Sequence, residues 1–303
     1  MVNSINIFAF GIDEYLRKIF KKGTESDITI YNRKEGDNFI TVLTPLRFPD
    51  KLSALTDAMF PADIVVFNGD TINKDLGEAI ICAELMKKKK GYFICSPETD
   101  TARLKKMFSG TMAANYEIYT DQPMNFLSEI CKFKREEKGD ENTSVIIDHF
   151  FKVKSVGTVI LGFVTNGKLS RHQDLIVSYS ESKVQVRSIQ MNDIDFEEAG
   201  SGSRVGIALK GGDTDDMERG STLTPDKPQY LKTFSSRISI HPMAKGKFNE
   251  NGEIFLANNM RYQRARISGN EIEMDSRIQK LPYYLILSPN TSPRIIGTAE
   301  PLE

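Results

Sequence analysis

The sequence predicts an α/β domain followed by two small all-β barrels. Up to about residue 135, short apolar runs alternate with amphipathic helical stretches; a highly charged segment follows, and then β-branched runs between turn residues. Alternating strands and helices indicate a mostly parallel sheet with helices on both faces, and evenly spaced short strands are typical of a closed barrel. We therefore expect three domains, over residues 1–135, 144–225 and 227–303.

The first domain starts with a strand over residues 5–10, an apolar run that ends at Gly11. A helix is expected over 12–22, where apolar residues recur at helical spacing before Gly23. The same periodicities predict strands at 27–31, 39–43, 63–67, 91–95 and 116–119, and helices at 50–60, 73–89, 99–108 and 123–134. One strand pair is joined by a hairpin, so we expect one antiparallel edge strand.

Residues 132–143, KFKREEKGDENT, are expected to form an exposed linker because they are charged and contain a glycine. After it the helical periodicity ends. Strands of the second domain are expected at 145–147, 157–164, 174–178, 183–189 and 204–210, with a turn at Asn166-Gly167. Those of the third are expected at 234–240, 252–257, 261–268, 271–274, 283–287 and 294–298.

Composition excludes several classes of protein. The net charge of −1 argues against an overall basic surface for nucleic acid. The sequence contains no signal-peptide pattern and no apolar run long enough for a membrane helix. Cys82, Cys95 and Cys131 lack metal-binding spacing, so we expect no metal, no membrane association and a reducing cytoplasmic location.

The second domain contains an ordered series of short motifs. They are Val156-Gly-Thr-Val159, Val186-Arg-Ser-Ile-Gln190, Glu198-Ala199, Arg204-Val205, Lys210-Gly211 and Arg219-Gly220. This series resembles the second domain of translational GTPases of the elongation factor Tu type, and the archaeal selenocysteine-specific elongation factor SelB is the most similar branch. The first domain is similar in element order to Ras-like P-loop GTPase domains, and residues 294–298 resemble the last strand of the family's third domain.

The resemblance implies a nucleotide site whose signatures are missing here. Where the family has G-x-x-x-x-G-K-[ST], this chain keeps Gly11 but continues with Leu16-Arg17-Lys18. Thr44-Pro-Leu-Arg47 stands in place of D-x-x-G, and Ser96-Pro-Glu-Thr99 in place of N-K-x-D. We therefore expect a degenerate GTPase domain with no catalytic residues, no nucleotide-binding residues and no cofactor.

One alternative is that shifted loops still bind an anionic group. Asn68 and Asp70, like Thr44 and Pro45, follow expected strands, and ligands favour the carboxyl ends of such strands. This alternative allows either weak GTP binding or a different enzyme activity at the same edge of the sheet.

The resemblance also implies residues that hold the acceptor end of aminoacyl-tRNA. By position these are Asp148, His149 and Phe151; His149 replaces the acidic residue usual in the family, and Leu161 replaces a threonine. The alternative is that Phe151 belongs to the barrel core and the other two to its rim. Arg187 and Arg219 are candidates for phosphate contacts, or they brace loops of the barrel.

The third domain contains the best local basic patch, Arg261, Tyr262, Arg264 and Arg266, which is compatible with RNA or with an ordinary solvated face. Lys87–Lys90 is interpreted as a helix end, with RNA contact as the alternative. The acidic run at 213–216 is interpreted as a variable loop rather than a Ca²⁺ site.

These observations favour a non-hydrolysing relative of a translation elongation factor that binds tRNA, the ribosome or a translation protein. The main alternative is a protein-interaction scaffold or regulator built on an inactive GTPase domain.

Overall fold

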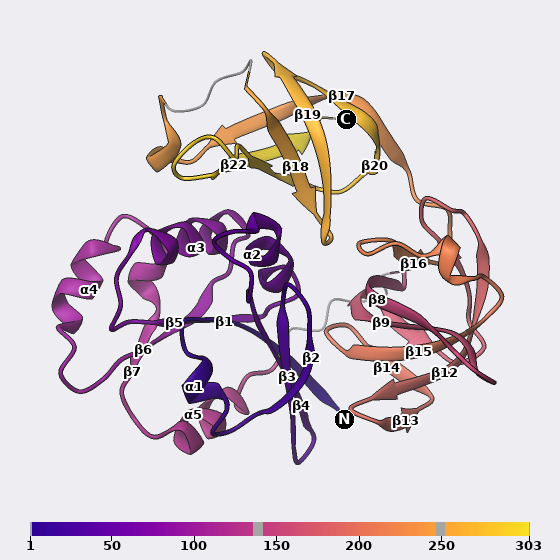
Figure 1. The fold of residues 1–303 in the computed structure, drawn as a ribbon, viewed down its shortest axis with the longest axis horizontal. Coiled ribbons are helices and arrows are strands. Elements are labelled where there is room, and N and C mark those ends of the chain that lie inside the picture. Colours follow the sequence, from indigo (N-terminus) through magenta and orange to yellow (C-terminus); the bar gives the residue numbers. More distant parts are fainter. Residues whose placement is uncertain (1, 136–141, 247–251, 303) are drawn as a thin grey trace.

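The computed structural model describes residues 2–135, 142–246 and 252–302. Its elements form an α/β unit followed by two β-barrels, so the predicted fold class is confirmed. The last barrel lies beside helices α2 (Leu52–Met59) and α3 (Lys74–Leu85) of the α/β unit (Figure 1). Among the described residues, every helix falls short of the length and apolar character that a membrane span needs.

The α/β unit is built on a seven-stranded sheet in the order β2-β3-β4-β1-β5-β6-β7. Its strands are β1 (Asn3–Phe10), β2 (Lys21–Glu25), β3 (Thr29–Glu35), β4 (Asn38–Thr44), β5 (Ile64–Asn68), β6 (Lys90–Ile94) and β7 (Glu117–Tyr119). The strands from β4 to β7 in this order are parallel, whereas β3 pairs antiparallel with β4 and β2 antiparallel with β3. One strand, β3, thus runs against the others as predicted, but β2 rather than β3 forms the edge of the sheet.

Helices cover both faces of this sheet because its central strands are apolar on both sides. Besides α2 and α3, they are α1 (Asp13–Leu16), α4 (Thr101–Met107) and α5 (Pro123–Ile130), with a short 3₁₀ turn η1 (Met112–Asn115). On β1, Phe8 packs in the cluster that includes α2, α3 and α4, whereas Ile5 and Ile7 pack in the cluster that includes α1 and α5. The sheet is therefore sandwiched between two separate cores.

The helix predicted over residues 12–22 is wrong beyond its first turn, since α1 ends at Leu16 and residues 21–25 form strand β2. Ile19, whose spacing suggested a helical face, is buried together with Phe20 in the turn between the two elements. Every residue of β2 is exposed, because the strand pairs at the edge of the sheet and covers nothing. It therefore lacks the apolar alternation by which a strand is recognised in a sequence.

The first barrel follows. Its strands are β8 (Ser144–Val153), β9 (Gly157–Asn166), β11 (Asp174–Val177), β12 (Lys183–Met191), β15 (Arg204–Lys210) and β16 (Thr222–Thr224). They pair in the order β11-β16-β8-β9-β15-β12, and pairing of β11 with β12 closes the barrel. The shorter elements are β10 (Lys168–Ser170), β13 (Ile194–Phe196), β14 (Glu198–Gly200) and the 3₁₀ turn η2 (Thr214–Asp216). Residues 136–141 of the expected linker lie outside the described residues.

The second barrel closes in the order β17-β20-β19-β18-β21-β22. Its strands are β17 (Tyr230–Ile240), β18 (Ile254–Asn258), β19 (Arg261–Ser268), β20 (Glu271–Gln279), β21 (Tyr284–Leu287) and β22 (Ile295–Pro301), with a 3₁₀ turn η3 (Pro242–Ala244). Strands β8 and β20 extend well beyond the short runs predicted for them. The far end of β20, residues 275–279, is mostly polar and exposed, whereas that of β8 mixes polar and apolar residues without a clean alternation.

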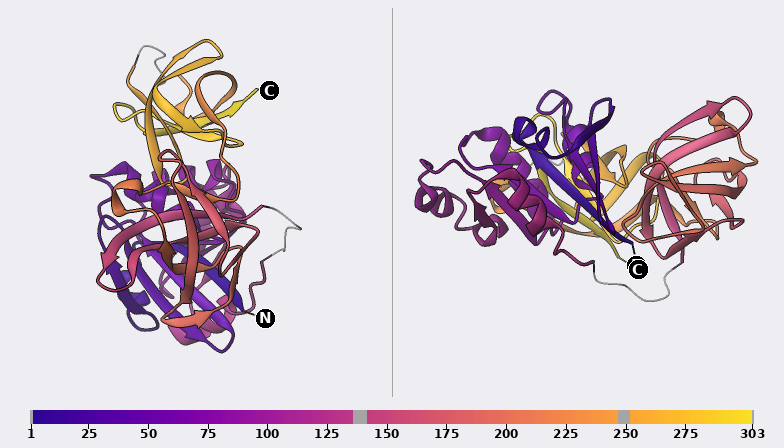
Figure 2. Two further views of the ribbon diagram at one scale, coloured as in Figure 1. Left: turned by 90° about the vertical axis from the view of Figure 1, so that its right-hand side faces the viewer. Right: turned by 90° about the horizontal axis from the view of Figure 1, so that it is seen from below.

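One hydrophobic cluster connects all three units. It contains Phe8 and Leu55 of the α/β unit, Ile146 and Phe163 of the first barrel, and Leu285 of the second. The views in Figure 2 show the two barrels against the same α/β unit. Separating the units would expose this shared apolar surface, so burial of that surface opposes relative movement of the units.

Candidate functional site

The turn after β1, where the family resemblance places a phosphate loop, is short and covered. Only Gly11 and Ile12 lie between the end of β1 and the start of α1. Gly11 has a φ of +75°, and a Cβ atom at this position would lie 3.1 Å from Cβ of Asn68. Asn68 also donates a hydrogen bond from Nδ2 to the carbonyl of Gly11, at 2.9 Å. The side chain of Asn68 therefore covers the turn.

Apolar side chains fill the space beneath that turn. Leu16, at the position of the family's second glycine, is 1% exposed and packs with Ile19 and Phe20. The carboxylate of Asp13 accepts hydrogen bonds from Tyr31 Oη at 3.1 Å and Thr44 Oγ1 at 3.4 Å. A short, packed helical turn therefore occupies the place where the superfamily resemblance expects the phosphate loop.

The polar residues at the carboxyl edge of the sheet bind one another. The amide of Asp70 donates to Asn68 Oδ1 at 2.8 Å, and Asp70 Oδ1 accepts from the amide of Ser96 at 2.8 Å and from the hydroxyl of Thr99. Ser96 Oγ and Thr99 Oγ1 lie 3.1 Å apart. This arrangement ties the turn after β5 to the turn after β6.

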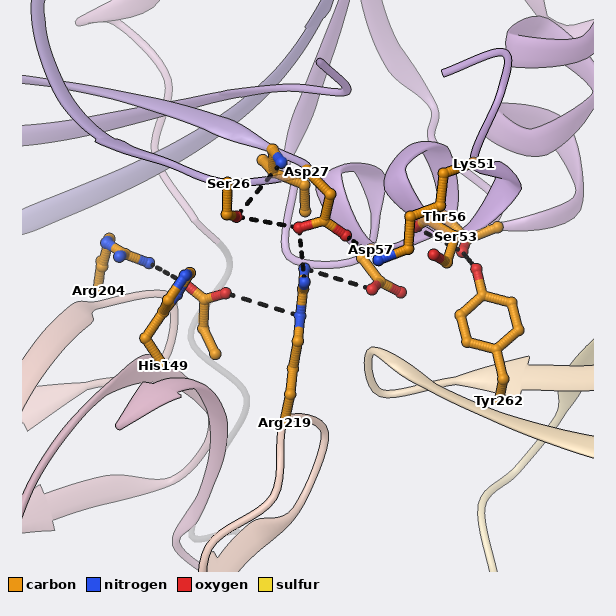
Figure 3. A network of polar contacts seen from close by, with 12 residues as sticks. Ser26, Asp27, Lys51, Ser53, Thr56, Asp57, His149, Arg204, Arg219 and Tyr262 are labelled. Atoms are coloured by element: carbon orange, nitrogen blue, oxygen red, sulfur yellow. Dashed lines mark hydrogen bonds and ion pairs between the residues drawn. The ribbon is translucent and has the colours of Figure 1, made fainter. Parts of the chain in front are cut away.

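A network of buried charges lies where the three units meet. Arg219, from the segment between η2 and β16, inserts its guanidinium between Asp27 and Asp57 of the α/β unit (Figure 3). Its Nη1 donates to Asp27 Oδ1 at 2.8 Å, its Nη2 lies 3.3 Å from Asp57 Oδ2, and its Nε lies 4.0 Å from Asp148 Oδ1. One cation thus faces three buried carboxylates, of which only Asp27 accepts a hydrogen bond from it.

Two further cations complete this network. Lys51 Nζ lies 2.8 Å from Asp27 Oδ2, and Arg204 Nη1 lies 2.9 Å from Asp148 Oδ2. Burial by itself raises the pKa of Asp27, but hydrogen bonds from Lys51 and Arg219 outweigh it and hold the pKa well below its usual range. Burial likewise opposes ionisation of Asp148, yet His149 and Arg204 lower its pKa to about 2. Both carboxylates are therefore ionised at neutral pH.

The pKa of Asp57 is shifted in the opposite direction from those of Asp27 and Asp148. Asp57 lies on α2 among buried apolar residues, and burial raises its pKa to about 7 although Arg219 opposes the shift. Ionised Asp27 and Asp148 nearby raise it further. Asp57 is thus the member of the network that gains a proton most readily near neutral pH.

Other contacts fix the same junction. Tyr262 of β19 reaches α2, where its hydroxyl bonds that of Thr56. Arg294 Nη2 pairs with Glu78 Oε2 of α3 at 2.6 Å, and its Nη1 donates to the carbonyl of Pro49 at 2.8 Å. Asn6 Nδ2 donates to the carbonyl of Gly202 in the first barrel at 2.8 Å. Each barrel is therefore bonded directly to the α/β unit.

A basic hollow separates the antiparallel edge of the sheet from the first barrel. Its two adjoining parts, about 290 and 500 Å³, share Gly23, Asn32, Arg33, Asn192 and the acidic Asp193 in their walls. The remaining basic and aromatic lining residues are Lys21, Lys22, Lys34, Phe39 and Arg204. We call this hollow the basic cleft.

Several cations of the basic cleft already have partners. Arg33 pairs with Glu35 at 2.7 Å, and Lys22 with Glu25 at 2.5 Å. Within the described ranges, Lys21 and Lys34 form no ion pair, and Lys34 Nζ lies 5.6 Å from the ring centroid of Phe39. The half-buried ring of Phe39 in turn packs edge-on against Phe196 of the first barrel. The cleft therefore combines available positive charge with an aromatic surface.

Known proteins resemble this chain over most of its length. An uncharacterized protein of Methanocaldococcus jannaschii is 34% identical over 242 residues, covering 79% of this chain and 79% of that protein. The family model for elongation factor Tu domain 2 matches residues 157–224. The chain belongs to one family with this archaeal protein, within the translational GTPase-like superfamily.

Other members of the superfamily agree with this assignment. The selenocysteine-specific elongation factor of the same organism is 36% identical over 101 residues, which is 33% of this chain and 22% of that protein. The crystal structure of translation elongation factor SelB from Methanococcus maripaludis, in its apo form, has a TM-score of 0.81 at 20% identity and covers 100% of this chain and 80% of its own. The SelB-like three-domain fold is therefore established for this member of the superfamily.

Two of the three residues that the superfamily resemblance suggested for the acceptor end, Asp148 and His149, lie beside the basic cleft. Asp148 is 3% exposed and ion-paired, and Nδ1 of His149 lies 3.1 Å from it. His149 is registered opposite Leu161, which lines the cleft. Phe151 is 44% exposed, so its assignment to the barrel core is wrong. The roles of these residues in tRNA binding stay predictions.

The two arginines proposed for phosphates are placed differently. Arg187 is exposed on the barrel and donates to the carbonyl of Val156 at 3.1 Å. Arg219 is engaged by the carboxylates of the junction, so its position corresponds to the bracing alternative rather than to a free phosphate ligand. Two of its partners, Asp27 and Asp57, are functional residues that sequence reasoning missed. A carboxylate in the apolar helix LSALTDAM was the available signal for Asp57.

The basic patch predicted on β19 is divided by the fold. Tyr262 faces α2, and Arg261 lies over the ring of Tyr179, 3.7 Å from its centroid, and pairs with Glu218. Arg264 and Arg266 line a surface hollow together with Glu253, Glu271 and Glu273. Their charge is therefore balanced locally. Among the described residues, His, Cys, Asp and Glu form no group suited to a metal ion.

We expect Arg219→Met to lower the free energy of unfolding by about 3–5 kcal/mol, because Asp27 and Asp57 would lose their shared cation while remaining buried. Urea denaturation measures this loss. Arg187→Met, which removes an exposed arginine from the same barrel, is the matched control and should change stability by less than about 0.5 kcal/mol. Equal effects of the two substitutions would show that the junction network does not stabilise the fold.

We expect the stability of the wild-type protein relative to Asp57→Asn to fall as the pH rises from about 4 to 7. The folded protein holds the proton of Asp57 up to about pH 7, whereas the unfolded chain releases it near the ordinary value of 3.8. Folding therefore takes up a proton in this window, and raising the pH opposes it. The difference in unfolding free energy should change by more than about 1 kcal/mol and become flat above pH 7. A constant difference would contradict the raised pKa.

Proposed function

We propose that this member of the superfamily is a translation factor-like protein that binds tRNA or ribosomal RNA without using a guanosine nucleotide. The observation that carries the proposal is the basic cleft between the edge of the sheet and the first barrel. It combines two lysines that have no ion-pair partner among the described residues, an aromatic ring and amide side chains. Lysines neutralise phosphates, and exposed rings stack on unpaired bases.

The identity of the neighbouring barrel supports RNA from the translation machinery as the ligand. It matches elongation factor Tu domain 2, and it forms one wall of the cleft through Leu161, Arg204 and Val205. A cleft of this volume between two domains suits a single-stranded end of RNA better than a duplex. The proposal places the protein in the cytoplasm, where tRNA and ribosomes are found.

We also propose that the protein neither binds nor hydrolyses GTP. This second part of the proposal is supported by the two-residue turn after β1 and by the packed side chains of Leu16, Ile19 and Phe20 beneath that turn. The proposal includes no catalytic residue, no cofactor and no metal.

A nucleotide titration tests this second part. With about 1 mM GTP or GDP and Mg²⁺, we expect the urea midpoint of the protein to stay unchanged. A dissociation constant of about 10 µM would instead stabilise the folded state by about 2.7 kcal/mol, which is readily measured. Such stabilisation would show that the chain retains a nucleotide site and would replace the proposal with a weakly GTP-binding elongation factor.

Filter binding of labelled aminoacyl-tRNA and ribosomes tests the first part. We expect Lys21→Gln combined with Lys34→Gln to weaken binding by about 10-fold or more, and to reduce the slope of affinity against salt by about 1 to 2. Lys105→Gln combined with Lys106→Gln removes two exposed lysines from α4 and serves as the matched control. Absence of binding, or equal losses in both double variants, would exclude the basic cleft as the RNA site.

A further inference from the structure

A second hollow lies between the α/β unit and the last barrel, and the proposed RNA binding does not use it. Its volume is about 730 Å³, within the usual range of ligand sites. One wall comes from α3 and α4, and the other from η3 and residues 291–294 near the start of β22. In Figure 1 this place corresponds to the side of α3 that faces β22. We call it the apolar groove, because apolar atoms provide most of its exposed lining.

Three large apolar side chains remain exposed in this groove. Ile72 precedes α3, Met107 ends α4 and Met243 lies in η3, and they are 38%, 49% and 61% exposed. Single exposed apolar residues are normal, but three from separate elements that line one hollow indicate a binding surface. Methionine side chains are flexible and adapt to differently shaped apolar partners.

The charge around the groove selects the kind of partner. Glu78 and Arg294 neutralise each other in its wall. Of the remaining lining residues, Asp50, Asp75 and Lys74 carry charge, and none of the three has an ion-pair partner in the part of the chain that the structure describes. Two carboxylates against one ammonium group repel phosphate, so RNA is a poor occupant, and they attract basic side chains.

The walls of the groove are held in place before any partner arrives. The pair between Arg294 and Glu78 joins the last barrel to α3, and the bond from Arg294 to the carbonyl of Pro49 joins it to the segment before α2. A preformed groove loses little conformational entropy on binding. Met107 and Met243 lie outside the hydrophobic cluster that connects the three units, so they remain available to a partner.

We propose that the apolar groove docks an amphipathic helix of a partner protein, with an apolar face flanked by Lys or Arg. The apolar face covers Ile72, Met107 and Met243, and the basic flank pairs with Asp50 and Asp75. This mode of recognition, a helix laid in a groove between two elements, relies on apolar anchors spaced along one helical face. It does not depend on RNA binding, which uses another surface.

Fluorescence anisotropy tests the proposal with a labelled 18-residue model peptide, leucine on one helical face and lysine on the other. We expect Met107→Glu combined with Met243→Glu to weaken its binding by about 10-fold or more. Met124→Glu is the matched control, because Met124 is a 51% exposed methionine on α5, outside the groove. Asp50→Asn combined with Asp75→Asn should weaken binding and flatten its salt dependence.

Several other outcomes of these binding experiments would contradict the proposal. Absence of binding, equal affinity in all variants, or stronger binding of the counterpart peptide with glutamate in place of lysine would overturn the proposal. Sedimentation of the protein alone tests a second copy as occupant. Self-association that Met107→Glu and Met243→Glu abolish would assign the groove to another copy of this chain and would also overturn it.

Discussion

The position of the first barrel against the α/β unit depends on the guanidinium of Arg219. It is contributed by the first barrel, it is bonded to the α/β unit through Asp27, and it faces Asp57 and Asp148. A buried charge of this kind costs desolvation free energy, which is offset only while the surrounding carboxylates stay in position. Apolar packing alone would tolerate small shifts between the units, whereas the directional contacts of Arg219 favour one orientation. The network therefore specifies the geometry of a junction that the shared core stabilises.

The same junction matters for the α/β unit, whose sequence departs from the nucleotide-binding motifs of the superfamily. In a nucleotide-driven protein, the groups that sense the terminal phosphate transmit its presence to neighbouring domains. Here the segment around Asp27 and helix α2 are bonded to the barrels by Arg219 and Tyr262. A ligand at the turn after β1 would have to break these contacts in order to move the barrels. The covered turn after β1 and the bonded junction are therefore both consistent with barrels that keep one position against the α/β unit.

Much of the fold follows from the sequence because periodicity and turn residues are local signals. Strands β4, β15 and β19 appear close to where apolar alternation and β-branched runs place them. Strand β2 was missed because an exposed edge strand buries nothing and leaves no pattern. The motifs of the first barrel can be recognised in the sequence. The ion pairs of Arg219 with Asp27 and Asp57 cannot, because these partners are more than 160 residues away in the chain and ion pairing leaves no periodic pattern. Likewise, the division of the β19 patch depends on which face of the strand meets α2.

The composition of β2 has a further consequence for the solution behaviour of the protein. An open sheet edge exposes unpaired backbone groups that can pair with a strand of another molecule. Strand β2 reads KKGTE, so two lysines, a glutamate and a glycine occupy that edge. Charge repulsion and weak strand propensity there oppose edge-to-edge aggregation. The lysines that line the basic cleft thus also keep the sheet from growing, and apolar residues in their place would favour fibrous assembly.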